Sequence, residues 1–301
     1  MSATPNELTV IDRKTGRPCA EPVLGGALLR LAYESSLRPL ARTLLMRTGW
    51  LSRLLGWYTR TGASRRDIRR AIEQLGIDES EFLEPTRSFR TFHDFFVRRL
   101  DPACRPFDPQ SEALVSPADA RLTVIPEVRH GTAVPVKGCR FEIVRLLGRP
   151  REAAAFESGQ AFVFRLCPAD YHRFHYPADG SLEERYEISG RYDSVNPIAL
   201  NLGIPVFTEN RRVVSLLTLE VFGRCAFVEV GAFGVAGITE THRGTSFSKM
   251  DEKGFFHYGA STVILLLEHG ALQPAPDLVQ NTTAGFETLV RAGETLGRGA
   301  R

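Results

Sequence analysis

The chain has 301 residues, of which 43% are hydrophobic and 24% are charged. A chain of this length and composition can bury a large core, so it is not expected to be disordered and should form one large domain or two small ones. It contains no apolar run of about 18 residues, which argues against a membrane-spanning helix.

The net charge of +3 is unevenly distributed along the chain. Ten arginines and two acidic residues lie between Leu28 and Arg70, so the remainder of the chain is net acidic. This suggests an anionic surface as the partner of the basic region alone. The five cysteines are scattered without CxxC spacing, which indicates free thiols in a reducing compartment. The polar segment up to Pro22 resembles neither a secretory signal nor a transit peptide.

Residues 24–58 are predicted to form two helices separated near Pro39, because proline disfavours a helix interior. One face carries Arg30, Glu34, Arg38 and Arg42 at steps of four residues. Trp50 and Trp57 are seven residues apart, so they also share a helical face. This pattern is typical of a helix that lies in a membrane interface. A soluble helical cap packed on the body is the alternative that the pattern leaves open.

Two shorter helices should follow. Ser64 is expected to cap a helix over residues 65–75 that ends at Gly76, and residues 89–100 should form another helix with a phenylalanine-rich core face. Three prolines mark residues 101–108 as a linker.

From Leu114 onward, short apolar runs are separated by glycine and proline, which predicts a β-rich body and an α+β fold. We expect strands at residues 161–166 and 263–267, a hairpin from 213–221 and 225–230, and a last strand or two within 286–297. The glycine spacing after the hairpin is not that of a nucleotide site, and no nucleic-acid partner is expected.

Ser261 stands at the start of a predicted buried strand, directly after the small residues Gly259 and Ala260. A hydroxyl beside an uncrowded peptide bond can attack the carbonyl of that bond. Asp119, His175 and Ser261 could supply the orienting acid, the base and the nucleophile that serine activation requires. A tight turn with a serine that only caps the strand is the simpler interpretation.

Other chemistries remain open from the residues alone. His172 and His175 could bind a metal, but no third ligand cluster is visible, so no metal is expected. A serine hydrolase with an Asp-His-Ser triad is possible in principle, although the residues around Ser261 lack the second glycine of a nucleophile elbow.

A set of short motifs occurs in a fixed order through the chain, and the complete set is far more specific than any one of its members. The set comprises Ser88 to Phe96 with Arg98, Arg105-Pro106, Pro117-Ala118-Asp119, Asp170-Tyr171-His172-Arg173 with His175, Ser194-Val195-Asn196, Glu209-Asn210-Arg211, and Glu252 to Phe256 before Ser261-Thr262. In these motifs the chain resembles the phosphatidylserine decarboxylase family of self-processing pyruvoyl enzymes.

The resemblance implies that Asp119 and His175 activate Ser261, which attacks the Ala260 carbonyl and forms an ester. Elimination and hydrolysis would then leave a pyruvoyl group at position 261. The products would be a β chain, residues 1–260, and an α chain, residues 261–301. The pyruvoyl group would form a Schiff base with phosphatidylserine, release CO2 and give phosphatidylethanolamine, with His172 as proton donor.

The chain departs from the family pattern at two positions. Gly259-Ala260-Ser261-Thr262 stands where the family has LGST or GGST, which puts the cleavage rate in question. Ala120 replaces the glycine of the family's PADG motif. A soluble pyruvoyl enzyme acting on a free amino acid such as tryptophan, and a lipid-binding relative without activity, are the alternatives.

The expected organisation is a flexible N-terminus over residues 1–23, a helical membrane-associating cap over 24–108 and a catalytic body over 109–301. The resemblance further implies peripheral attachment to the cytoplasmic face of a bacterial membrane. Phosphatidylserine in an anionic membrane is the expected partner. The two chains should remain together as a heterodimer, which can itself dimerise.

Overall fold

The computed structural model describes residues 9–21, 50–128, 134–136, 139–193, 195, 204–231, 237–259 and 261–299. For residues 50–53, 134–136 and 139–141 it describes the backbone alone. The two helices expected to be split near Pro39 therefore fall largely outside the described residues, as does Ala260.

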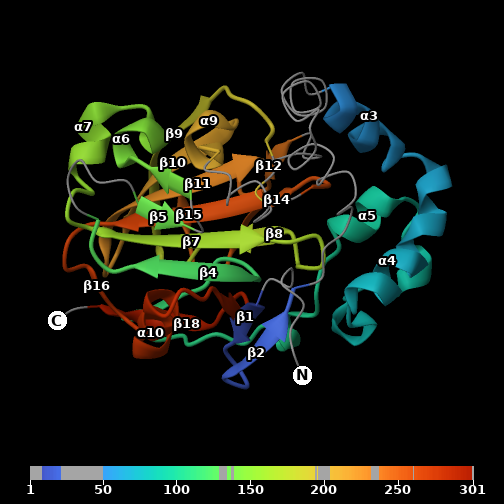
Figure 1. The fold of residues 1–301 in the computed structure, drawn as a ribbon, viewed down its shortest axis with the longest axis horizontal. Coiled ribbons are helices and arrows are strands. Elements are labelled where there is room, and N and C mark those ends of the chain that lie inside the picture. Colours follow the sequence, from blue (N-terminus) through green and yellow to red (C-terminus); the bar gives the residue numbers. More distant parts are fainter. Residues whose placement is uncertain are drawn as a thin grey trace.

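A mixed sheet forms the body, which confirms the α+β fold (Figure 1). Within the described residues it has ten strands in the order β13-β9-β10-β11-β15-β7-β4-β17-β1-β2. Neighbouring strands are antiparallel except for β1 and β17, which pair in parallel. The strands are β1 (Thr9–Asp12), β2 (Arg17–Ala20), β4 (Ala120–Ile125), β7 (Gln160–Leu166), β9 (Gly180–Ile188), β10 (Arg212–Leu219), β11 (Gly223–Gly231), β13 (Ser246–Phe247), β15 (Ser261–Leu267) and β17 (Thr288–Val290).

Smaller sheets and short helices cover the two faces of the large sheet. The smaller sheets are β12-β14-β8, β16-β18-β3 and the pair β5-β6. Their strands are β3 (Ala113–Val115), β5 (Val134–Val136), β6 (Cys139–Phe141), β8 (Arg173–His175), β12 (Ile238–Glu240), β14 (Glu252–Phe256), β16 (Leu272–Pro274) and β18 (Thr295–Gly299). The body helices are α6 (Ile143–Leu147), α7 (Pro150–Ala154), α9 (Val206–Glu209) and α10 (Pro276–Thr283).

Strand β15 lies inside the large sheet between β11 and β7, and all seven of its residues are buried. Side chains alternate between the faces of a strand, so Val263 and Leu265 enter one core and Ile264 and Leu266 the other. Helices α6, α7 and α9 close the second core, whereas β8, β14 and the β16-β18-β3 sheet close the first. The predicted strands 161–166 and 263–267 and the predicted hairpin are therefore confirmed.

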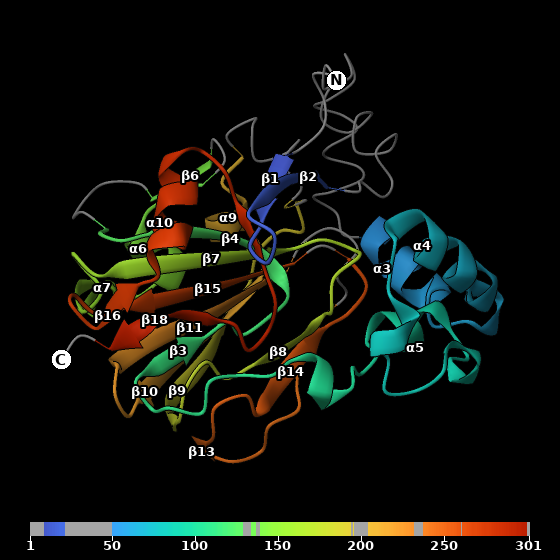
Figure 2. The ribbon, with the colours of Figure 1, turned by 90° about the horizontal axis from the view of Figure 1, so that it is seen from below.

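The described helices of the N-terminal third lie together at one end of the body (Figures 1 and 2). We call residues 50–105 the cap. Its elements are α3 (Trp50–Tyr58), α4 (Asp67–Leu75), α5 (Phe92–Phe96) and the 3-10 helices η2 (Gly62–Arg66), η3 (Glu79–Glu81), η4 (Thr86–Ser88) and η5 (Pro102–Cys104).

Gly76 ends α4 in the left-handed conformation, as predicted. Ser64 does not cap this helix. It is buried inside η2, where its hydroxyl bonds the Thr59 and Thr61 carbonyls and accepts from the Phe92 backbone N–H. The helix predicted over 89–100 is limited to Phe92–Phe96, because a capping box between Thr91 and Asp94 starts it late.

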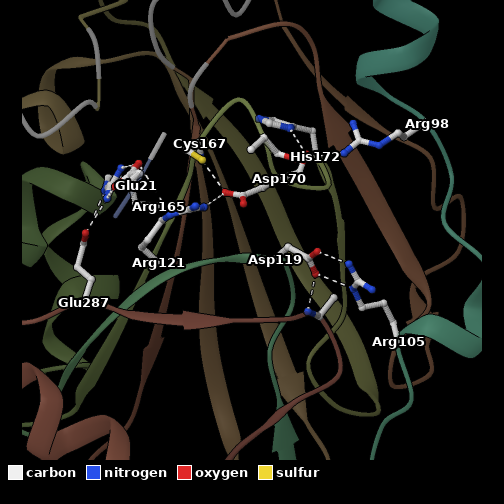
Figure 3. A network of polar contacts seen from close by, with 12 residues as sticks. Glu21, Arg98, Arg105, Asp119, Arg121, Arg165, Cys167, Asp170, His172 and Glu287 are labelled. Atoms are coloured by element: carbon white, nitrogen blue, oxygen red, sulfur yellow. Dashed lines mark hydrogen bonds and ion pairs between the residues drawn. The ribbon is translucent and has the colours of Figure 1, made fainter. Parts of the chain in front are cut away.

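The N-terminal segment departs from the expected flexible tail. Residues 9–20 form the hairpin β1-β2, and β1 extends the large sheet by pairing with β17. Glu21, directly after the hairpin, and Glu287, directly before β17, both bind the buried guanidinium of Arg165 on β7, with oxygen–nitrogen distances of 2.6 Å (Figure 3). An ion triad therefore holds this end of the sheet together.

Removing Arg165 should be costly, because it takes the cation from between two buried carboxylates. In a Ser261→Ala background, which is designed to keep one chain, we expect Arg165→Leu to lower the free energy of unfolding by about 3–5 kcal/mol in urea titrations. Arg69→Leu is the control: its exposed ion pair with Glu73 should contribute about 1 kcal/mol or less. Equal losses in the two variants would contradict the role given to the triad.

Candidate functional site

Ser261 is the first residue of β15 and is fully buried. It pairs with Gly231 on β11 and with Leu166 on β7, and it shares a face with Val263. Its hydroxyl has no hydrogen-bond partner among the described residues. A buried hydroxyl without a partner is costly, so this atom is a candidate for chemistry rather than for stability. Gly259, two residues earlier, has φ of 140°, a conformation that favours glycine.

His172 lies just before β8 and is completely buried. Its ring packs on Phe96 of the cap, with centroids 3.9 Å apart, and its Nδ1 bonds the Asp170 carbonyl at 2.9 Å. A carbonyl can only accept, so the proton is assigned to Nδ1, and Nε2 is left as a buried acceptor without a described partner. Burial lowers the pKa of His172 to about 3, so the ring is neutral at pH 7.

The segment before Ser261 runs beside His172. The Phe256 backbone N–H donates to the His172 carbonyl at 2.9 Å. The Gly259 backbone also lies near enough to the ring to oppose, in small part, the burial that lowers its pKa. Tyr258 packs edge-on against Phe92 and Phe96, with centroids 5.4 and 5.2 Å apart. The cap therefore packs against both His172 and the segment that leads to Ser261.

Two arginines fix the loop that carries His172 (Figure 3). The Asp170 carboxylate accepts from Arg121 and from the Cys167 backbone N–H. Arg98 of the cap donates to the Ala169 and Asp170 carbonyls at 3.2 and 3.4 Å. The Asp170 carbonyl thus meets both Arg98 and the His172 ring. Sequence reasoning included Arg98 in a motif but gave it no role, because nothing local shows which loop it reaches.

Asp119 is held by a different arginine. Its carboxylate accepts from Arg105 Nε at 2.9 Å and Nη2 at 2.6 Å, and from the Ala292 backbone N–H at 2.8 Å. Arg105 Nη2 also binds Glu81 of the cap at 2.8 Å. Arg105 was recognised only as part of a motif, so its contact with Asp119 is a finding of the structure.

His175 lies on β8, close to Asp119 along the backbone, because its N–H donates to the Pro117 carbonyl at 2.8 Å. Its Nδ1 bonds the Met250 carbonyl at 3.0 Å, and its ring stacks on Tyr171. Burial lowers the pKa of His175, and the nearby Glu252 and Asp119 charges partly oppose this. No hydrogen bond joins His175 to Asp119 or to Ser261 among the described residues, so the three-residue relay remains a prediction.

A cavity of about 230 Å³ opens between the cap and the body next to Asp119. Arg98, Arg105, Arg121, Asp170 and Tyr171 contribute to its walls. Many of the side chains that line it are charged, and it is lined by Asp119 but not by Ser261. In the described part of the chain, no group of His, Cys, Asp and Glu side chains is arranged to hold a metal ion.

Comparison with known proteins finds relatives over nearly the whole chain. The family model for phosphatidylserine decarboxylase matches residues 92–298. A phosphatidylserine decarboxylase proenzyme of Ruminiclostridium cellulolyticum is 36% identical over 291 residues, covering 96% of this chain and 97% of that protein. A protein of the same name from Chlamydia caviae is 37% identical over 296 residues, covering 98% and 99%. A third, from Desulfitobacterium hafniense, is 34% identical over 287 residues, covering 95% and 96%.

These matches define the protein as a carboxy-lyase. The chain belongs to the phosphatidylserine decarboxylase family, which confirms the resemblance seen in its motifs.

The buried state of His172 predicts a pH dependence of stability. Its pKa is 6.5 when exposed and about 3 when folded, so between these values the unfolded chain binds a proton that the folded chain does not. Stability should therefore rise with pH across this window, by up to about 1.4 kcal/mol per pH unit for one proton. In the Ser261→Ala background, unfolding free energies between about pH 4 and 6.5 should follow a shallower slope for His172→Gln. Identical slopes would contradict the assigned pKa.

Proposed function

We propose that the chain is a phosphatidylserine decarboxylase proenzyme that cuts itself between Ala260 and Ser261. The buried Ser261 hydroxyl, without a described partner and placed after Gly259 at the start of β15, carries this proposal. Serine attack on its own peptide needs a hydroxyl that is not committed elsewhere and a backbone that can bend toward it. The three relatives described above are all named as proenzymes, which supports the same conclusion.

His175 is the proposed base for this attack, and Asp119 is its proposed orienting acid. The Pro117 carbonyl accepts from the His175 N–H, which keeps the two residues on neighbouring backbones. The Met250 carbonyl accepts from Nδ1, so Nε2 carries the lone pair that can take the Ser261 proton. The Asp119 carboxylate accepts from Arg105 and from the Ala292 N–H. To orient His175, Asp119 must therefore exchange one of these partners for the histidine.

Position 261 suits a pyruvoyl group, because elimination would remove the buried Ser261 Oγ, which has no described partner, and would leave a methyl group there. Such a group supplies a ketone that binds the substrate amine and accepts the electrons left when CO2 departs. His172 Nε2 is a neutral acceptor at pH 7. To act as proton donor it must first take up a proton. The product would be phosphatidylethanolamine.

After cleavage, residues 1–260 and 261–301 should remain together as a β chain and an α chain. Strand β15 belongs to the α chain, yet both of its sheet neighbours, β11 and β7, belong to the β chain. Its apolar side chains fill both cores, so separation would expose them to water. A dimer of such pairs is part of the same proposal.

The cap is proposed to contact an anionic membrane surface. Leu54 and Trp57, one helical turn apart on α3, are 49% and 64% exposed. Large apolar side chains beside arginines are what an interfacial helix presents to a bilayer. None of the helices described here has the length and apolar character needed to cross a membrane. Peripheral attachment on the cytoplasmic face of a bacterial membrane is the localisation that we propose.

Self-cleavage is tested by intact-mass analysis of the purified protein. We expect two chains divided between Ala260 and Ser261, with a pyruvoyl group on the smaller one. Ser261→Ala should remain uncut, because the nucleophile is gone, and His175→Ala should cut at least about tenfold more slowly. A single full-length species that labels with a fluorophosphonate would instead indicate a hydrolase. Self-cleavage of His175→Ala at the wild-type rate would exclude His175 as the base.

Substrate and membrane contact are tested together by CO2 release. Wild-type protein should decarboxylate phosphatidylserine in vesicles but not free tryptophan. The double variant Leu54→Ala, Trp57→Ala should bind phosphatidylserine vesicles about tenfold more weakly, because apolar contact with the bilayer is lost. Val221→Ala, which alters a 45% exposed apolar residue on the body, is the control and should bind normally. Equal vesicle binding by the wild type, the double variant and Val221→Ala would contradict the proposed contact between the cap and the membrane.

A further inference from the structure

Three basic side chains meet where the cap touches the segment before Ser261. Arg60, after α3, donates from Nη2 to His257 Nδ1 at 3.0 Å. His93 of α5 stacks on the His257 ring, with centroids 5.0 Å apart and planes inclined by 11°. On the body side, Thr239 of β12 meets His257 Nε2 at 2.8 Å. We call Arg60, His93, Thr239 and His257 the seam cluster.

The hydrogen-bond roles in the seam cluster follow from Arg60, which can only donate. His257 Nδ1 must therefore accept, so the ring proton lies on Nε2 and is donated to the Thr239 oxygen. The Thr239 hydroxyl hydrogen and the remaining Arg60 N–H groups are then available to a further acceptor. The cluster offers several donors that converge and has few acceptors of its own.

The charges of the seam cluster are also unbalanced. Among the described residues, no carboxylate forms an ion pair with Arg60, and the nearest acid to influence His93 is Asp94. Asp94 is already engaged by the Thr91 and Arg90 backbone N–H groups. Burial and the neighbouring positive charges lower the pKa of His257 to about 4. An anion placed against the cluster would balance the Arg60 charge, and arginine is well suited to bind phosphate oxygens.

The position of the seam cluster relates it to the reacting atoms. His257 follows Phe256, whose N–H binds the His172 carbonyl, and it precedes Ser261 by four residues. Arg60 is exposed, whereas the two imidazole rings are partly buried. In a serine phospholipid the phosphodiester is joined through one methylene to the carbon that carries both amine and carboxylate. When position 261 holds the amine, the phosphate must therefore lie close by.

We propose that the seam cluster binds the phosphodiester of the substrate headgroup, with Arg60 as its principal ligand. This inference rests on the proposed function, because it assigns the headgroup to a site beside position 261. Its chemistry is that of a phosphate oxyanion, which a lipid headgroup and free phosphate share. The cluster would bind the substrate without taking part in bond breaking. The expected signature is therefore a change in KM rather than in kcat.

The kinetic test uses the self-cleaved enzyme and a short-chain phosphatidylserine below its micelle concentration, so that membrane binding does not contribute. Arg60→Gln should raise KM about tenfold with kcat within about twofold, because a charge-assisted bond is lost in ground and transition states alike. The KM of Arg60→Lys should lie between those of the wild type and Arg60→Gln, since lysine keeps the positive charge but lacks the planar guanidinium that can bind two oxygens. Arg69→Gln removes an exposed arginine from the same cap and should leave KM unchanged. An unchanged KM in Arg60→Gln would overturn the inference.

A binding test separates the two sources of phosphate and does not depend on catalysis. In uncut Ser261→Ala protein, the NMR signal of the His257 ring is followed during titration with glycerophosphoserine or with inorganic phosphate. Saturation by glycerophosphoserine at about tenfold lower concentration, lost in Arg60→Gln, would support the headgroup assignment. Equal affinities would make this a free-phosphate site and overturn it. Wild-type enzyme that releases no CO2 from phosphatidylserine would refute the proposed function, whatever the NMR titration shows.

Discussion

The placement of β15 at the interior of the large sheet is the constraint on which the rest of the molecule depends. A strand buried on both faces and bonded along both edges cannot shift its register by one residue without moving every apolar side chain into the wrong core. The first residue of that strand is Ser261. A strand that is buried on both faces therefore fixes the serine, while Gly259 before it has a conformation that favours glycine.

The second determinant is the way the cap closes over this point. Phe96 packs on the His172 ring, Tyr258 packs edge-on against Phe92 and Phe96, and Arg98 bonds the loop that carries His172. A buried neutral imidazole is the result, and its environment comes from two parts of the chain that are about seventy residues apart in sequence. Cap and body thus build the site jointly. A role for the cap in membrane contact would place the lipid surface next to the chemistry.

Sequence patterns predicted the elements whose signals are local. The continuous apolar run of β15, the turn at Phe222-Gly223 in the hairpin and the terminating Gly76 each determine a structure by themselves. Ser64 and residues 89–100 were predicted incorrectly, because tertiary bonds from Ser64 and the capping box at Thr91 outweighed helix propensity. Asp119, His172, His175 and Ser261 were singled out by their chemistry and motifs. The contacts made to this site by Arg105, Arg98 and Met250 could not be found this way, because long-range hydrogen bonds and ion pairs leave no periodic trace in a sequence.

The parallel pairing of β1 with β17 has a consequence for how the protein is made. The two strands are more than 270 residues apart in the sequence, since Ile11 pairs with Thr288, so the β1-β2 hairpin has no neighbouring strand until β17 has been synthesised. The Arg165 triad needs Glu287 as well as Glu21, so it must form at the same late stage. This edge of the sheet is therefore completed only after most of the body has left the ribosome. A nascent chain that stops before Glu287 would lack both the strand pairing and the triad.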